Sequence, residues 1–125
     1  MLGPYDRTRM EPLATHFDEA PGDVLPLAPE LSALYGPLRV PSRPDRPHVV
    51  TNFVASVDGI VAIDPPRGTG ADLSGGDARD RAVMGLLRAV CDAVVIGAGN
   101  LRAERGHVWT AERICPELAP AYAAL

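Results

Sequence analysis

The segment HVVTNFVASVDG, residues 48–59, carries the strongest signal of the fold. Its part 49–55 is apolar and rich in β-branched residues, which is typical of a strand buried on both faces of a parallel sheet. A similar run, AVVI at 93–96, follows a helical pattern at 75–89. Strand, helix and strand with short connections form the βαβ unit of a parallel sheet. The sequence therefore predicts an α/β fold with a mostly parallel sheet flanked by helices.

The predicted helix at 75–89 has a start signal and an apolar face. Ser74 is the expected N-cap, with Asp77 three residues later as in a capping box. Arg88 lies late in the helix, where a positive charge suits the macrodipole. The apolar face consists of residues at helical spacing, namely Ala78, Ala82, Val83, Leu86, Leu87 and Val90.

Proline divides the chain near Pro47. Nine of the 13 prolines lie at or before this residue, and proline disfavours regular sheet and long helices. We predict two parts, a Pro-rich N-terminal arm at 1–47 and the N-terminal half of a reductase-like α/β domain at 48–125. Within the arm, 29–35 has the pattern of a short helix. The arm either lays this helix on the body or remains a partly disordered leader.

The remainder of the chain offers one weak strand at 60–63, a Gly-rich loop at 67–72 and a last helix beginning near Pro116. A layered parallel sheet needs more strands and helices than these. We therefore expect that the domain is truncated, and that a partner or a longer polypeptide completes it. We also expect self-association through the apolar 93–96 strand, most simply as a homodimer.

Composition excludes several classes of function. The net charge is −4 and no basic run is present, so nucleic-acid binding is not expected. No apolar stretch suggests a membrane span or signal peptide. Cys91 and Cys115 form no CxxC pattern, the three histidines lack metal-ligand spacing, and Cys91 is expected to be a small buried hydrophobe. We expect a cytoplasmic protein without a metal.

Three polar or glycine-rich features could carry a ligand. The Gly97-Ala98-Gly99 turn follows a predicted strand, where glycines let backbone N–H groups approach a phosphate. The turn Ser56-Val57-Asp58-Gly59 ends the first strand, at the edge where α/β sheets bind ligands. Asn52 lies within an apolar strand, where a buried amide needs a hydrogen-bond partner. Taken singly, each feature is explained as well by an ordinary structural role.

The order of these motifs resembles one family. The order is Asn52, Ser-Val-Asp-Gly, a Gly-rich loop, a Ser-capped helix ending Leu-Leu-Arg-Ala, the strand 92–96 and Gly-Ala-Gly. It is similar to the reductase domain of the riboflavin-biosynthesis deaminase–reductases and their stand-alone pyrimidine reductase relatives. The resemblance covers about residues 30–108 and implies a dihydrofolate-reductase-like fold.

The resemblance also implies an activity and a set of site residues. Such proteins use NADPH to reduce the ribosyl group of an aminopyrimidine ribosyl phosphate, 5-amino-6-(5-phosphoribosylamino)uracil, to the ribityl form. The substrate is thus a phosphorylated aminopyrimidine. The positions assigned to the cofactor are Ala55, Ser56, Gly97, Gly99, Asn100 and Glu104. Those assigned to the substrate are Asn52, Asp58 and Arg88, the last for its phosphate. Hydride transfer needs mainly orientation of the reactants, so no catalytic acid or base is assigned.

The sequence departs from the family pattern in three ways. Asn100 stands where the family has threonine, and the 106–109 stretch differs from the usual continuation. The second Gly-Gly phosphate loop of the family does not occur in the 125 residues, so we expect weak or no NADPH binding by this chain. Two alternatives remain open: a non-catalytic reductase-like binding or interaction module, and a pterin- or dihydrofolate-type reductase of the same fold.

Overall fold

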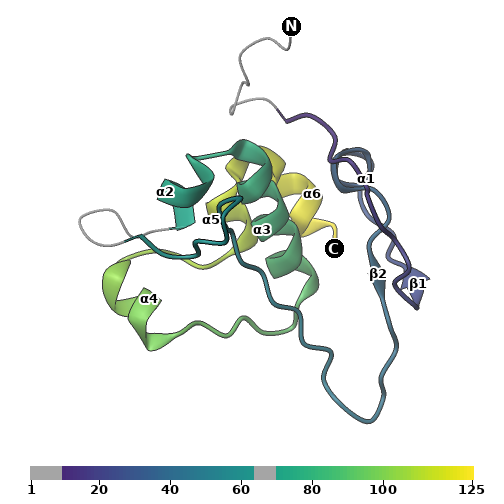
Figure 1. Cartoon of the computed structure of the whole chain (residues 1–125). Coiled ribbons are helices and arrows are strands. Elements are labelled where there is room, and N and C mark those ends of the chain that lie inside the picture. Colours follow the sequence, from purple (N-terminus) through teal and green to yellow (C-terminus); the bar gives the residue numbers. More distant parts are fainter. Residues whose placement is uncertain (1–9, 64–69) are drawn as a thin grey trace, which may run out of the picture.

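The computed structural model describes residues 10–63 and 70–125 (Figure 1). Helices make up most of its regular structure. The helices are α1 (Pro29–Tyr35), α2 (Gly70–Ser74), α3 (Ala78–Val90), α4 (Ala98–Ala103), α5 (Ala111–Ile114), the 3₁₀ helix η1 (Pro116–Leu118) and α6 (Ala119–Ala123), and the strands are β1 (Asp23–Val24) and β2 (Arg39–Val40).

The predicted parallel sheet is wrong, and with it the dihydrofolate-reductase-like fold class. Within the described ranges the sheet consists of two short antiparallel strands, β1 and β2. Residues 49–55, 60–63 and 93–96 form no strand and are mostly exposed. β-branched apolar residues favour extended backbone, but a strand also needs a neighbour for its N–H and C=O groups. The sequence pattern reported the first property and carried no information on the second.

Two single-residue expectations fail for the same reason. Asn52 was predicted to lie in a buried strand, and its side chain is exposed. Cys91 was predicted to be buried just before the second strand, and it is exposed. Without a sheet, nothing covers either position.

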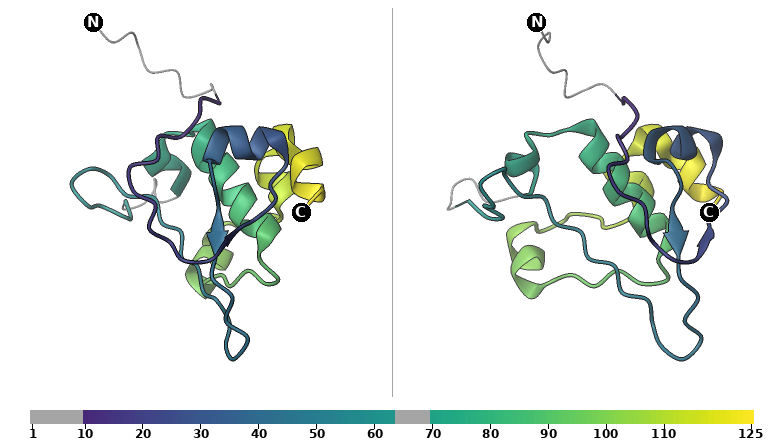
Figure 2. Two further views of the ribbon diagram at one scale, coloured as in Figure 1. Left: turned by 90° about the vertical axis from the view of Figure 1, so that its right-hand side faces the viewer. Right: turned by 45° about the vertical axis from the view of Figure 1, so that its right-hand side comes forward.

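The core lies instead between helices. Leu31 and Leu34 of α1 pack in one cluster with Ala82 and Leu86 of α3 and with Cys115 and Tyr122 from the C-terminal helices. Figure 2 shows α1 beside α6 in both of its views. An α-helix satisfies its own backbone, so these short elements need only bury one apolar face each.

A close approach joins α3 to α6. The Tyr122 hydroxyl donates a hydrogen bond to the Ala82 carbonyl oxygen at 3.0 Å. The ring passes over Gly85, where an added Cβ would lie only 2.5 Å from the tyrosine oxygen. Glycine at position 85 therefore permits this packing of the last helix.

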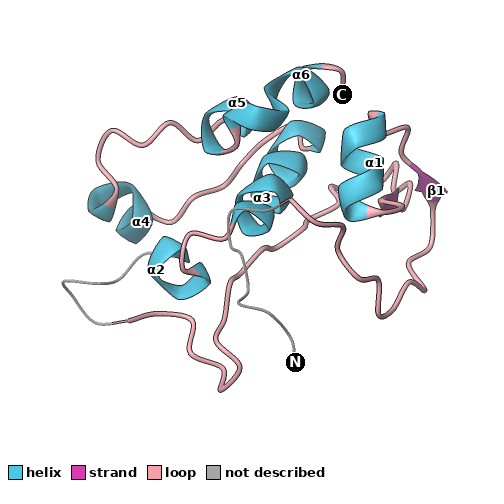
Figure 3. Cartoon of the chain, turned by 90° about the horizontal axis from the view of Figure 1, so that it is seen from above, coloured by secondary structure: helices cyan, strands magenta, loops and turns pink. Residues whose placement is uncertain are grey.

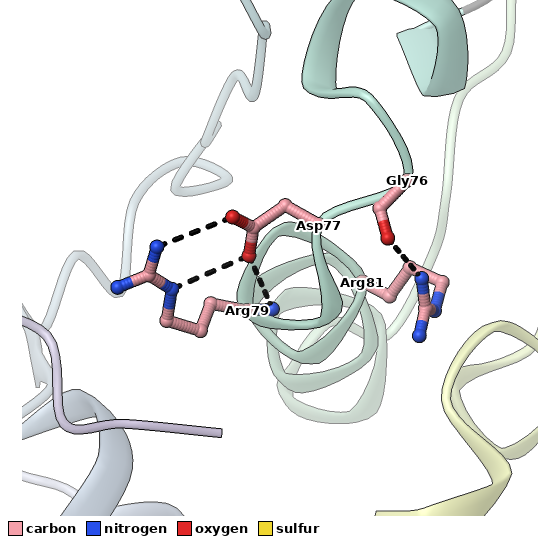
Figure 4. Close-up of polar contacts among 4 residues, drawn as sticks. All are labelled: Gly76, Asp77, Arg79 and Arg81. Carbon is pink, nitrogen blue, oxygen red and sulfur yellow. Dashed lines mark hydrogen bonds and ion pairs between the residues drawn. The ribbon is translucent and has the colours of Figure 1, made fainter. Parts of the chain in front are cut away.

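The start of α3 corrects the predicted cap. Ser74 is the last residue of α2, and Gly75 and Gly76 follow with positive φ angles of 62° and 73°. Asp77 is the N-cap: its carboxylate accepts a hydrogen bond from the Arg79 N–H at 2.8 Å and pairs with the Arg79 guanidinium at 3.2 Å (Figure 4). The two glycines reverse the chain, so the helix begins three residues later than predicted.

The N-terminal arm folds back on itself around α1. The helix predicted at 29–35 is found with these bounds. Leu13 N–H donates to Leu34 C=O at 2.7 Å, and β1 pairs with β2 in the register Asp23 with Val40. The predicted helix near Pro116 is found as η1 and α6. The predicted loop at 67–72 lies partly outside the described residues, and its last part begins α2.

Figure 3 shows α4 at the end of the molecule opposite α1. Long loops connect α4 to α3 before it and to α5 after it. α4 buries no residue. The chain returns from α4 toward the core through residues 104–110, and this return carries the candidate site.

Candidate functional site

A tight turn after α4 brings two ionisable side chains together. The His107 N–H donates to the Glu104 C=O at 3.1 Å, and Gly106 between them has a φ of 85°. Glycine adopts this left-handed conformation without steric cost. The turn places the His107 Nδ1 atom 3.7 Å from the Glu104 carboxylate. This distance suits an ion pair when the imidazole is protonated.

Trp109 connects this turn to the end of α3. The His107 and Trp109 rings meet edge to face, with centroids 4.4 Å apart. The Arg88 guanidinium carbon also lies over the Trp109 ring, 5.2 Å from its centroid. This separation is within the range of cation–π attraction. Arg88, Glu104, His107 and Trp109 therefore form one cluster, called below the Arg88 cluster.

The Arg88 cluster contains buried nitrogen atoms that lack partners. Across residues 10–63 and 70–125, the side-chain nitrogen or oxygen atoms that are buried without a hydrogen-bond partner are Arg88 Nη1, His107 Nε2 and Trp109 Nε1. Buried polar groups in folded proteins are nearly always hydrogen-bonded, and leaving one unpaired costs about 1–3 kcal/mol. All three atoms belong to the Arg88 cluster, so the missing hydrogen bonds are concentrated at one place.

Electrostatics at Arg88 reflect both burial and a neighbour. Removal from water lowers the pKa of the Arg88 guanidinium, and the negative charge of Glu104 acts in the opposite direction and raises it. An arginine remains protonated in proteins under ordinary conditions. The cluster thus presents a partly desolvated positive charge that Glu104 offsets from one side.

A hollow of about 670 Å³ adjoins the Arg88 cluster. Arg88 and Trp109 line it together with the first residues of α5 and residues of α6, including Glu112 and Tyr122. Pockets that bind small molecules have volumes of about 300–1,000 Å³. The hollow therefore offers room for a small molecule beside Arg88 and Trp109.

The residues assigned to the cofactor do not converge on one site. The Ser56 hydroxyl contacts the Asp58 carboxylate, and the Ser56 N–H donates to the Ile60 C=O at 2.9 Å. The assigned residues Ser56 and Asp58 thus belong to a locally closed turn. Asn52 and Ala55, which precede this turn, are exposed.

The assigned residues Gly97, Gly99 and Asn100 do not form the predicted turn at the end of a strand. Gly97 is the N-cap of α4, while Gly99 and Asn100 lie within this six-residue helix and are exposed. In the part of the chain that the structure describes, no backbone hydrogen bond joins these positions to the turn at 56–60. A cradle for NADPH phosphates is not built from them. Of the nine assigned residues, the structure brings Arg88 and Glu104 into one cluster.

Sequence reasoning missed two members of the cluster. Trp109 entered the prediction only as part of the 106–109 departure from the family pattern, and His107 also as a histidine without metal-ligand spacing. A signal was nevertheless present, because Gly106-His107 is a plausible turn and Trp109 is the only tryptophan. Their approach to Arg88 depends on how residues 91–110 leave and rejoin the core, which no local pattern encodes.

Among the described residues, no group of three or more His, Cys, Asp or Glu side chains could hold a metal ion. In the same residues, no helix has the length and apolar character needed to cross a membrane. Comparison with protein-family models, curated proteins and solved structures finds no match to this chain.

Proposed function

We infer that this chain takes part in an NADPH-dependent reduction of the riboflavin-biosynthesis pyrimidine reductase type, and that its own contribution is to bind the substrate phosphate through Arg88. The substrate is a phosphorylated aminopyrimidine whose ribosyl group becomes ribityl. The proposal rests on the order of the sequence motifs and on the surroundings of Arg88. It does not rest on the fold, which differs from that of the family.

The observation that carries the proposal is the environment of Arg88. Its Nη1 atom is buried without a partner among the described residues, and the guanidinium faces an aromatic ring beside a hollow. Most arginines at a helix C-terminus are solvated and serve the macrodipole. A partly desolvated arginine with an unpartnered donor is better suited to holding an anion, for which bidentate hydrogen bonding is its characteristic role.

The cofactor part of the proposal has the motif order as its support. Ala55, Ser56, Gly97, Gly99 and Asn100 do not fit NADPH as a single site in this structure, so no chemical step is derived through the cofactor. We expect NADPH alone to bind weakly or not at all. The proposed location is the cytoplasm, in keeping with two free cysteines.

Calorimetric titration with the aminopyrimidine ribosyl phosphate tests the proposal, followed by an assay of NADPH consumption with both compounds present. Arg88→Gln should weaken substrate binding about 10- to 100-fold, because a charge-assisted hydrogen bond contributes about 1.5–3 kcal/mol. Arg102→Gln, on the exposed surface of α4, is the matched control. Unchanged substrate affinity in Arg88→Gln would sink the proposal, and micromolar binding of NADPH alone would overturn the expectation for the cofactor.

A second candidate function, a non-catalytic interaction module, is favoured by the exposed apolar side chains. Phe53 is 78% exposed and Val95 is 96% exposed, with Val49 and Val61 also largely in solvent. Exposed apolar surface of this extent marks protein contacts. Under this alternative the chain forms a homodimer through these segments and binds neither substrate nor NADPH. Light scattering on the sample used for calorimetry separates the two: a monomer that binds the substrate contradicts the alternative.

A further inference from the structure

The Arg88 cluster contains two side chains, Arg88 and Trp109, that cannot satisfy each other's hydrogen-bond donors. A guanidinium and an indole carry hydrogen-bond donors only. Arg88 Nη1 and Trp109 Nε1 therefore both need an acceptor, and the described residues provide none. The Glu104 carboxylate is not this acceptor, because neither nitrogen has a hydrogen-bond partner among the described residues; its Oε2 atom lies 3.7 Å from His107 Nδ1.

The second ring nitrogen of His107, Nε2, also requires a hydrogen-bond partner. With Nδ1 toward the Glu104 carboxylate, a protonated imidazole presents Nε2–H as a donor. Nε2 is buried and unpartnered as well. The three unpartnered nitrogen atoms thus belong to one contiguous group of side chains, because Trp109 contacts both His107 and Arg88.

We propose that His107 and Trp109 join Arg88 in a three-donor oxyanion site that takes the phosphate group of a phosphomonoester. The inference rests on the phosphate-binding role proposed for Arg88, and it adds two residues that the family resemblance does not supply. A phosphomonoester has three terminal oxygens that accept hydrogen bonds, which matches three donors on three side chains. A carboxylate has two. The adjoining hollow of about 670 Å³ accommodates the organic part of the ligand.

Glu104 acts in this site as a positioning residue. Its carboxylate oxygen lies 3.7 Å from His107 Nδ1, so it orients the imidazole. Its charge also opposes the bound anion, as does that of Glu112 at the edge of the hollow. The two carboxylates therefore limit the affinity for any anion.

The single tryptophan makes the site directly observable. Titration of the full 125-residue chain with inorganic phosphate, and separately with ribose 5-phosphate, is followed by the Trp109 indole N–H resonance and by calorimetry. A new hydrogen bond should shift the indole proton downfield in a saturable manner. Acetate, titrated in parallel, should bind at least about tenfold more weakly, corresponding to one lost hydrogen bond of about 1.4 kcal/mol.

Three variants divide the contributions. Arg88→Gln should weaken phosphate binding about 10- to 100-fold, as removal of a charged donor does. Trp109→Phe keeps an aromatic ring and removes the N–H, and His107→Phe keeps a ring and removes both nitrogens. Each of these two substitutions should weaken phosphate binding about 2- to 12-fold, in line with the loss of a hydrogen bond of about 0.5–1.5 kcal/mol. Arg102→Gln is again the control, and circular dichroism verifies that each variant is folded.

The outcomes separate the inference from the proposed function. Phosphate binding that is lost in Arg88→Gln but unchanged in both ring variants overturns the inference and leaves the proposed role of Arg88 intact. Acetate binding as tight as phosphate binding also overturns it. No phosphate binding by the unmodified chain overturns both. Phosphate binding sensitive to all three variants, with no NADPH consumption, supports the inference and contradicts the reductase activity.

Discussion

Two parts of this molecule have similar apolar content and opposite burial. Helices α1 and α3 and the C-terminal helices bury their apolar side chains, as in Leu86 with 1% exposure. Residues 49–63 and 93–96 are equally apolar but remain in solvent, as in Val95 with 96% exposure. The difference lies in how each kind of element satisfies its backbone. Helices do so alone, whereas strands need neighbours that the described chain does not provide.

Thiol reactivity offers the largest expected contrast between the two parts. Cys115 is fully buried in the helical core, and burial raises the pKa of its thiol, so little reactive thiolate is present. Cys91 is exposed beside the 93–96 segment. Cys115 should react with a maleimide at least about a thousandfold more slowly, because it requires an opening that costs about 4 kcal/mol or more. Mass spectrometry of peptides from one labelled sample measures both rates. Equal rates would contradict the described core.

Truncation of one apolar side chain in each part should give unequal losses of stability. Leu86→Ala removes a buried side chain from the core and should lower the free energy of unfolding by about 2–5 kcal/mol. Val95→Ala, at an exposed position, should change it by less than about 0.5 kcal/mol. Urea unfolding followed by circular dichroism compares them. A large loss for Val95→Ala would show that the 93–96 segment is buried in solution, against another part of the chain or a second copy.

A smaller effect concerns the start of the helical part. Asp77→Ala should lower the free energy of unfolding by about 1 kcal/mol, because the Arg79 N–H loses its cap. Ser74→Ala is the matched control, since Ser74 ends α2 and does not cap α3. Its effect should be within a few tenths of a kcal/mol, and the same urea titration measures both. The reverse order would restore Ser74 as the cap.

The sequence predicted the elements that depend on nearby residues. Helix 29–35 was found with its bounds, and α3 was found with an apolar face near the one expected. The cap of α3 was misplaced because Ser74 and Asp77 are both good capping residues, and the positive φ angles of Gly75 and Gly76 decided between them. The predicted strands were wrong because the sequence of a segment does not show whether a neighbouring strand is present to pair with it.

The candidate site, like the strands, depends on contacts between residues that are distant along the chain. Arg88 and Glu104 were assigned to different ligands and are found in one cluster. No ligand role was predicted for His107 and Trp109, because the 106–109 stretch differs from the family pattern and the sequence does not show that these side chains lie near Arg88. Three-dimensional proximity came from the turn at Gly106 and from the path of the chain between α4 and α5.

The contact between Gly85 and Tyr122 has a consequence for sequence variation. The tyrosine ring occupies the space that any larger residue at position 85 would need, and its hydroxyl is held by the Ala82 carbonyl on the same helix. A side chain at 85 therefore requires a smaller residue at 122, and the freed carbonyl then needs another donor. Positions 85 and 122, distant along the chain, are expected to covary.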